Sequence, residues 1–322
     1  MHNITKFFFA AALCFAFLNN TFSQPRQPAP ADTAKVGAYV FSIYDLDFPG
    51  NKIGVDFYIW YLCKNDSLKL NETFELVNSK SAEKTGESNE KKLGYSYVSF
   101  RCNSVIKQQW DVKNFPFDRQ YVELEIEDVN DQSMLVLLAD SIESKLDKNV
   151  SVEGYTIKNF GIKNEKHTYE TTYGDPTLKP DEYSTYSRVV IYFTLERQGG
   201  GVFFKLFMGL FISVLISLLT FFINPTDLDP RFGLSVGAIF AAIASEYVIS
   251  STLPQNQKLT LVDILHDISF IYIFICILIS AISLHYMKSG REQVSKKVDG
   301  YAFYFTAVSY ILLIGYFINR AL

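Results

Sequence analysis

The C-terminal third of the chain contains four apolar segments, at about 202–223, 232–253, 262–287 and 299–319. Each is long enough to cross the roughly 30 Å hydrocarbon core of a bilayer. The second segment differs from the others, because it has two glycines, four alanines and four serines and carries Glu246. A carboxylate at membrane depth is costly, so Glu246 is expected to face protein or water. The pattern predicts a helical bundle whose second helix either lines a pore or packs closely through small residues.

The N-terminal residues have the pattern of a secretory signal. Lys6 precedes an apolar run too short to span a membrane, and small or polar residues follow, so residues 1–23 are expected to form a signal peptide. Residues 24–35, rich in Pro and Ala, are expected to be a flexible segment. A domain over 36–197 would then lie outside the cytoplasm, followed by a membrane domain over 198–322.

The connection after the third apolar segment predicts the same orientation. It carries Lys288, Arg291, Lys296 and Lys297, and short basic loops stay on the cytoplasmic side. Counting spans back from this loop places the N-terminal domain on the periplasmic or extracellular side. The chain is therefore expected to be a multi-pass protein of the inner, or plasma, membrane.

The sequence lacks the motifs that are typical of several functional classes. The net charge of −4 includes no basic face for nucleic acid. There is no Gly-rich phosphate loop, Ser/His/Asp signature or Cys-x-x-Cys pair, so neither an enzyme nor a cofactor is expected. Asp263, His266 and Asp267 share a helix face that suits a divalent ion, but we interpret them as the wet end of a span and expect no metal. Cys63 and Cys102 make one outer disulfide possible but do not require it.

Alternating apolar and polar residues predict β-strands throughout the outer domain. A polar stretch at 79–92 is expected to be a solvated loop. The predicted fold class is an α+β multidomain membrane protein, with an antiparallel β-sandwich followed by a four-helix transmembrane bundle. The runs that predict strands are 36–44, 53–62, 95–101, 120–126, 155–162 and 186–195.

A distinctive loop, WDVKNFPFDRQ at 110–120, joins two of these strands. It has an Asp, a short spacer and an aromatic-Pro-aromatic-Asp-x-Gln core. The residues are Asp111, Phe115, Pro116, Phe117, Asp118 and Gln120. In this loop the chain resembles the pentameric ligand-gated ion channels, the Cys-loop receptor superfamily. Gln108 and Val122 stand where eukaryotic members have two cysteines, an absence typical of bacterial members.

The resemblance extends over about 36–322, with order and spacing preserved. Arg197 matches the arginine that ends the last outer strand, and Leu253-Pro254 matches the linker after the second span. There are also departures. Gly199–Gly201 stand near the place of a proline usual in the first span. The segment 73–78 lacks the Trp-x-Pro pattern of the first ligand-binding loop, which bears on the ligand site more than on the channel.

The resemblance implies that five copies of the second span surround a pore. Helical spacing then places one stripe of side chains on the axis, with Val236 and Ile243 as alternatives at two turns. The pore-lining candidates are Asp229, Gly233, Gly237, Phe240, Ala244, Tyr247 and Ser251. A ring of Asp229 carboxylates would favour cations. Arg231 would oppose this if it pointed inward, and Asp229-Pro230-Arg231 is also an ordinary helix start.

Two large side chains on this stripe are candidates for a gate. Rings of Phe240 and Tyr247 would form hydrophobic constrictions that close by dewetting, although Phe240 could instead pack on a neighbouring helix. Glu246 lies one position off the stripe. Because burial disfavours a charged carboxylate, it is the candidate proton sensor.

The resemblance also implies a coupling interface between the outer domain and the linker after the pore helix. Its expected members are Asp45, Asp47, Phe115, Pro116, Phe117, Asp118, Arg197 and Pro254. One arginine among partly shielded carboxylates can hold a bidentate pair and transmit displacement. Scattered surface charges of little energetic consequence are the alternative.

Ligand sites in this family lie between subunits and are often lined by aromatic residues, which attract amines through cation–π contacts. The aromatic candidates are Phe74, Tyr169, Tyr173, Tyr183 and Tyr186. Tyrosine is common throughout the chain, so ordinary packing is an equal alternative for these residues.

The sequence therefore predicts a homopentameric ligand-gated channel in contact with membrane lipids. It would conduct monovalent cations and open in response to an extracellular small molecule or to protons. The rival interpretation is a non-conducting membrane sensor with the same fold that signals through a partner.

Overall fold

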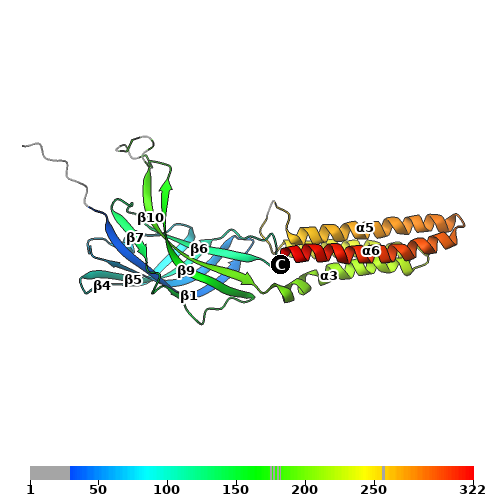
Figure 1. The fold of residues 1–322 in the computed structure, drawn as a ribbon, viewed down its shortest axis with the longest axis horizontal. Helices are drawn as coiled ribbons and strands as arrows, with labels where there is room; N and C mark the ends of the chain where they lie inside the picture. The colour runs from blue at the N-terminus through cyan, green and yellow to red at the C-terminus, as the bar shows by residue number, and fades with distance from the viewer. Residues whose placement is uncertain (1–29, 175, 177, 180, 182, 256–257) are drawn as a thin grey trace, which may run out of the picture.

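The computed structural model describes residues 30–322 apart from 175, 177, 180, 182, 256 and 257; the expected signal peptide and part of the expected flexible segment fall outside them. The described chain forms a β domain followed by a bundle of long helices, and the two lie end to end (Figure 1). The chain terminus at Leu322 lies where they meet (Figure 1).

Two sheets make up the β domain. One has the strand order β4-β5-β2-β1-β7, with β8 also paired to β1, and the other has the order β3-β6-β10-β9. Most neighbours are antiparallel, whereas β7 and β8 run parallel to β1. The strands are β1 (Asp32–Asp47), β2 (Lys52–Cys63), β3 (Phe74–Leu76), β4 (Ser79–Lys92), β5 (Tyr95–Lys107), β6 (Arg119–Asp128), β7 (Leu135–Ala139), β8 (Lys145–Leu146), β9 (Tyr155–Tyr169) and β10 (Ser184–Arg197); a short helix, α2 (Leu70–Thr73), precedes β3.

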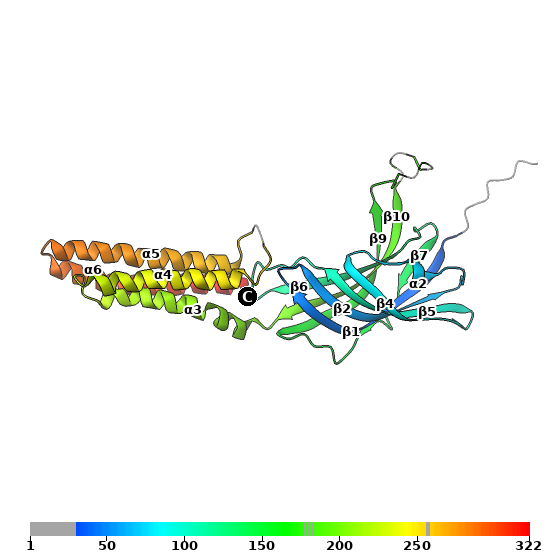
Figure 2. The same cartoon turned by 180° about the vertical axis from the view of Figure 1, so that it is seen from behind.

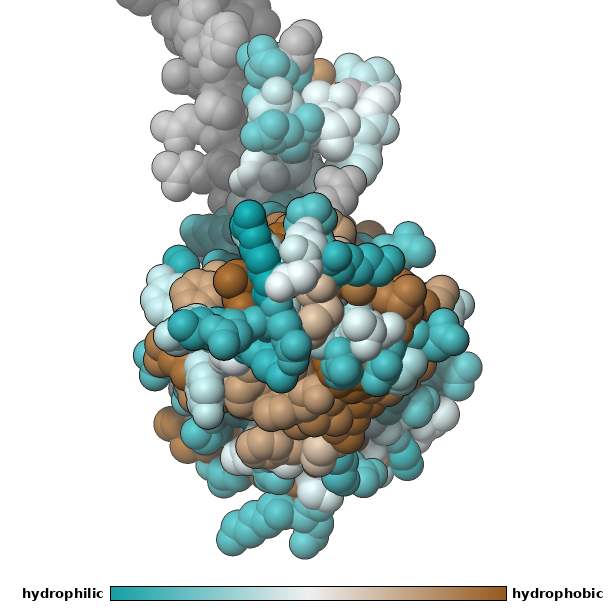
Figure 3. Space-filling view, turned by 90° about the vertical axis from the view of Figure 1, so that its right-hand side faces the viewer, coloured by the Kyte–Doolittle hydropathy of each residue, from teal (hydrophilic) through white to brown (hydrophobic). Residues whose placement is uncertain are grey.

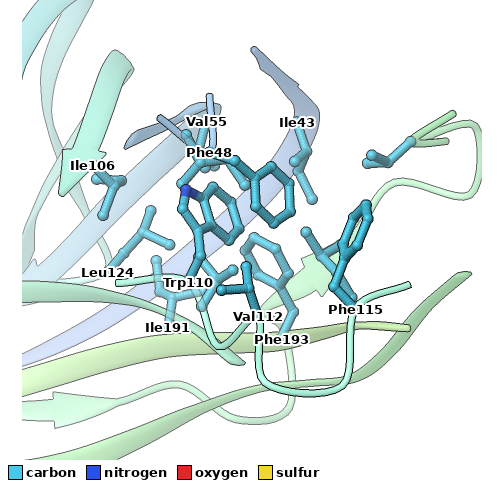
Figure 4. Close-up of a cluster of buried hydrophobic side chains, with 14 of the residues drawn as sticks. Ile43, Phe48, Val55, Ile106, Trp110, Val112, Phe115, Leu124, Ile191 and Phe193 are labelled. Atoms are coloured by element: carbon cyan, nitrogen blue, oxygen red, sulfur yellow. The ribbon is translucent and has the colours of Figure 1, made fainter. Parts of the chain in front are cut away.

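The expected period-two pattern fixes which faces of the sheets meet. Burial alternates along β5 and β6, because every second side chain points between the sheets. The core near the membrane end is built around Trp110, whose ring stacks on Phe48 at a centroid distance of 4.4 Å. Val112 and Phe115 from the 110–120 loop enter the same cluster (Figure 4). The loop is thus anchored in the sandwich by its own apolar side chains.

The expectation of a solvated loop at 79–92 was wrong. This segment is β4, which pairs with β5 along its length at the sheet edge. All of its side chains are exposed or half-buried, so it shows no apolar alternation. The strand is held by backbone hydrogen bonds, and a charged sequence is typical of an edge strand that must not pair with other chains.

Within the described residues, four helices are long and apolar enough to cross a membrane: α3 (Gly199–Leu219) with the 3₁₀ turn η1 (Thr220–Phe222), α4 (Leu228–Ser250), α5 (Leu261–Lys288) and α6 (Glu292–Ala321). The chain is accordingly a membrane protein. α4 packs against α3 and α5, while α6 packs mainly against α5 (Figure 2). Seen end-on from the side far from the β domain, hydrophilic residues cover the tip of the bundle and hydrophobic ones lie along its flanks (Figure 3).

The helices begin or end outside the apolar segments. α6 starts at Glu292, where Glu292 and Lys296 form an i, i+4 ion pair. α5 starts with a capping box between Thr260 and Asp263. Hydropathy marks only the part of a helix at membrane depth, so polar first turns of this kind do not appear in an apolar pattern.

Candidate functional site

α4 has one buried face and one exposed face. Its buried residues are Arg231, Ser235, Ala238, Ala242 and Ile249, which recur at helical spacing and face the inside of the bundle. All seven pore-lining candidates, Asp229, Gly233, Gly237, Phe240, Ala244, Tyr247 and Ser251, lie on the exposed side. Their side chains therefore make little contact with the other helices of the chain.

The two large candidates on this side make few contacts within the subunit. Phe240 is 66% exposed and Tyr247 is 77% exposed. Glu246 is half-buried beside the stripe. Asp229 is exposed in the first turn of α4, whereas Arg231 is fully buried and is turned into the bundle. The arginine therefore does not lie beside Asp229 on the exposed side.

At the junction of the two domains, Arg197 and Asp118 form a buried ion pair. Arg197 Nε donates to Asp118 Oδ1 over 2.7 Å, and Asp118 is 3% exposed. The arginine carbon Cζ also lies 4.5 Å from the ring centroid of Tyr155, 4.7 Å from that of Phe115 and 5.0 Å from that of Phe48. Burial raises the pKa of Tyr155. The guanidinium is held by one carboxylate and three aromatic rings.

Gln120 closes the base of the 110–120 loop. Its side chain accepts from Asp111 N over 2.9 Å and donates to Asp111 O over 2.8 Å. The same amide donates to Asp118 Oδ2 over 2.6 Å, so it also orients the carboxylate that binds Arg197. Gln108 Nε2 donates to Tyr121 O over 3.0 Å, next to Val122. Amide hydrogen bonds thus join the strands where the resemblance would place a disulfide.

The loop contacts two helices directly. Phe117 stacks on Phe203 of α3 at 5.5 Å, and Leu261 N of α5 donates to Lys113 O over 2.8 Å. A side chain on Gly199 would meet Pro116 O at 2.3 Å, so only glycine allows this approach. Sequence reasoning missed Phe203, Leu261 and this role of Gly199. The run of glycines in place of a proline was a signal that could have indicated it.

Of the other expected members of the coupling interface, Asp45 lies near the Arg197–Asp118 pair, whereas Asp47 and Pro254 have other neighbours. Asp45 is exposed and lines a cavity of about 460 Å³ with Arg197 and Thr252, the latter from the α4–α5 linker. Asp47 instead accepts from Gly50 N and lies 3.4 Å from Lys52 Nζ. Pro254 lines a separate cavity of about 660 Å³ with Gln108 and Trp110.

The structure brings three of the five ligand candidates together. Tyr169 lies edge-on to Tyr186 at 5.5 Å and is 5.9 Å from Tyr173. Tyr169 Oη donates to Glu127 Oε2 over 2.9 Å, and Glu127 also accepts from Arg188 Nε over 2.7 Å. Burial and the bond to Glu127 raise the pKa of Tyr169 to about 12, so its phenol is a hydrogen-bond donor at ordinary pH. We call Tyr169, Tyr173, Tyr186 and Glu127 the tyrosine cluster.

The remaining ligand candidates lie elsewhere. Phe74 is buried and packs edge-on against Phe100 of β5 at 5.2 Å. Tyr183 is exposed and donates to Asp181 Oδ1 over 3.2 Å. His266, which shares a helix face with two aspartates, is buried and hydrogen-bonded to Val262 O. Among the described residues, no group of three or more His, Cys, Asp or Glu side chains could hold a metal ion.

No protein-family model matches the chain. Curated proteins similar to it include gamma-aminobutyric acid receptor subunit rho-2 of Rattus norvegicus, 24% identical over 64% of this chain. Subunit rho-1 of Homo sapiens is 25% identical over 64%, and the beta subunit of Lymnaea stagnalis is 23% identical over 64%. The match spans about two fifths of each relative's length (42%, 41% and 40%). These relatives are receptor subunits rather than enzymes, and the chain resembles the Cys-loop receptor superfamily both in sequence and in fold.

Proposed function

We propose that the chain is a subunit of a homopentameric ligand-gated ion channel whose pore is lined by α4. The observation that carries this proposal is the division of α4 into a buried face and an exposed face with the small and polar residues Gly233, Gly237 and Ser251. Large apolar side chains such as Val248 are exposed on α4 as well, but there they alternate with small and polar residues. On α6 every exposed residue between 301 and 313 is large and apolar or aromatic, as suits contact with lipid.

The proposed permeant ions are monovalent cations. Five Asp229 side chains would form an anionic ring at the inner mouth, and rings of carboxylates favour cations. The helices would lie in an inner or plasma membrane, and the outer domain would be periplasmic or extracellular.

Current recording from purified protein in bilayers tests whether the protein conducts and which ion it prefers. A sodium chloride gradient distinguishes the two ions, because sodium and chloride currents then reverse at different potentials. We expect cation-selective current. Replacing Phe240 or Tyr247 with Ala, which removes a proposed constriction, should change conductance or open probability. Phe305→Ala is the matched control, because Phe305 is similarly exposed (73%) but lies on α6. Assembled protein that stays silent in all variants would instead support the non-conducting sensor.

We further propose that the tyrosine cluster binds a small amine. Aromatic faces attract an ammonium group. Glu127, 2% exposed at the base of the cluster, shares Arg188 with Glu125, so these three side chains together leave one net negative charge behind the tyrosines. The relatives are named as receptors for gamma-aminobutyric acid, which carries an ammonium group. Tyr169→Phe and Glu127→Gln should weaken amine binding or activation, while Tyr183→Phe should not. Equal effects of all three would argue against the site.

Protons are the second proposed agonist. Glu246 is half-buried beside the exposed stripe of α4, where a change of charge would act on the pore. Current should be recorded from pH 4 to 8 in wild type and Glu246→Gln. An identical pH response in both would remove Glu246 as the sensor.

A further inference from the structure

A buried ion pair links the inner end of the pore helix to the last helix. Arg231 on α4 is 0% exposed, and Asp299 on α6 is 5% exposed. Arg231 Nη1 donates to Asp299 Oδ2 over 3.0 Å, and Nη2 donates to Asp299 Oδ1. Nη1 also donates to Ile223 O over 2.9 Å. Assembly of subunits can only bury this pair further.

The pair lies next to an exposed charge of opposite sign. Asp229 precedes Arg231 by two residues, which places them about 200° apart around the helix. Asp229 is exposed, whereas Arg231 points into the bundle. Asp227, the N-cap residue of α4, is exposed as well. Without Asp299, each subunit would contribute two carboxylates and one free guanidinium to the inner end of α4, and the guanidinium would offset half of the negative charge.

We propose that Asp299 determines ion selectivity as a positioning residue, although it touches no permeant ion. By neutralising and burying Arg231, it leaves the negative charge of Asp229 and its neighbour Asp227 uncompensated at the inner mouth. This inference rests on the proposed channel function and adds a residue from a helix outside the pore.

Arg231 and Asp299 should behave differently once the partner of each is removed. A guanidinium cannot lose its proton in a protein, so Arg231 without Asp299 keeps its charge. Its long side chain can extend toward water, within the roughly 10 Å over which charges act at ordinary salt. A lone carboxylate in the same place would add no positive charge to oppose the Asp229 ring. Removing the acid and removing the base should therefore have unequal effects.

The experiment compares wild type, Asp299→Asn, Arg231→Gln and the double variant by reversal potential under a sodium chloride gradient. Asp299→Asn should lower the cation-to-anion permeability ratio about tenfold, because five positive charges are added near the Asp229 ring. Arg231→Gln and the double variant should stay close to wild type. An unchanged ratio in Asp299→Asn, or a loss that persists in the double variant, would overturn the proposal.

Labelling with phenylglyoxal, an arginine-specific reagent, tests the pair without any current. Mass spectrometry of purified wild type should show Arg231 unmodified while Arg119, whose side chain is 73% exposed, reacts. Modification of Arg231 in wild type would contradict the proposal, whereas protection in a silent protein would mean that only the channel function had failed. If Asp299→Asn does not assemble, Arg231→Gln decides, since a tenfold rise in its permeability ratio would show that Arg231 already acts on the pore.

Discussion

Arg197 Nε lies 2.7 Å from Asp118 Oδ1, and this contact joins the end of the last β-strand to the loop that touches the helices. The carboxylate is almost fully buried, and the arginine side chain is 13% exposed. A displacement of either β10 or the loop must therefore move the other or break the pair.

Asp118→Asn should uncouple the two domains. It leaves the Arg197 charge without its carboxylate, and breaking a buried pair in this way typically costs about 3 to 5 kcal/mol. We expect a lower melting temperature in detergent and a weaker response to agonist. Glu72→Gln is the control, because it breaks the exposed pair with Lys69 and should change neither quantity. Equal melting temperatures for Asp118→Asn and wild type would contradict the importance of the pair.

Gly199→Ala should disturb the contact between the 110–120 loop and α3. Its new methyl group would lie 2.3 Å from Pro116 O, a backbone atom that cannot rotate away. Overpacking of this kind costs about 1 to 3 kcal/mol. Gly200→Ala and Gly201→Ala are matched controls from the same turn, since neither position has a neighbour within 4 Å. Thermal unfolding and agonist response should separate Gly199→Ala from both controls, and identical behaviour of the three would refute the close approach.

The hydrogen bond from the Tyr169 phenol to Glu127 should persist at alkaline pH. Burial and the bond to Glu127 raise the pKa of Tyr169 to about 12, so its phenol stays protonated well above its usual value of 10. The stability that depends on this neutral phenol is complete below pH 10 and is lost as pH rises toward 12. Absorbance at 295 nm, compared between wild type and Tyr169→Phe, should show no difference at pH 10 and about half a tyrosinate fewer in the variant at pH 12, where Tyr169 is half ionised. A difference below pH 10 would argue against the bond.

Cys63 and Cys102 should resist alkylation in the folded protein. Both are free and buried, and burial raises the pKa of Cys102 to about 12 and also that of Cys63. The reactive thiolate is therefore scarce at pH 8. Treatment with iodoacetamide followed by mass spectrometry should find both unmodified until denaturant is added. Rapid labelling of native protein would show that the sandwich opens locally.

The sequence predicted the features that depend on local periodicity. The exposed stripe of α4 follows from helical spacing, and the sandwich follows from alternation in strands such as β5. β4 was missed because an edge strand is held by its neighbour's backbone and needs no apolar side chains. Edge strands of this type leave almost no signal in a single sequence.

Contacts between distant segments could not be predicted from local patterns. The position of Arg231 depends on Asp299, 68 residues later, and nothing near Arg231 in the sequence indicates its partner. The tyrosine cluster likewise depends on Glu127 of β6, which lies 42 residues before Tyr169. Asp47 was expected near Arg197, but Gly50 and Lys52 in its own turn bind it first.

The amide hydrogen bonds of Gln108 and Gln120 also make the 110–120 loop independent of the redox conditions around the protein. They are hydrogen bonds that form when the two sheets pack together, and they neither need an oxidant nor respond to a reductant. The loop that meets the helices can therefore mature without a disulfide-forming enzyme. Dithiothreitol should leave the proposed gating intact, which would let current recordings proceed in fully reducing solutions.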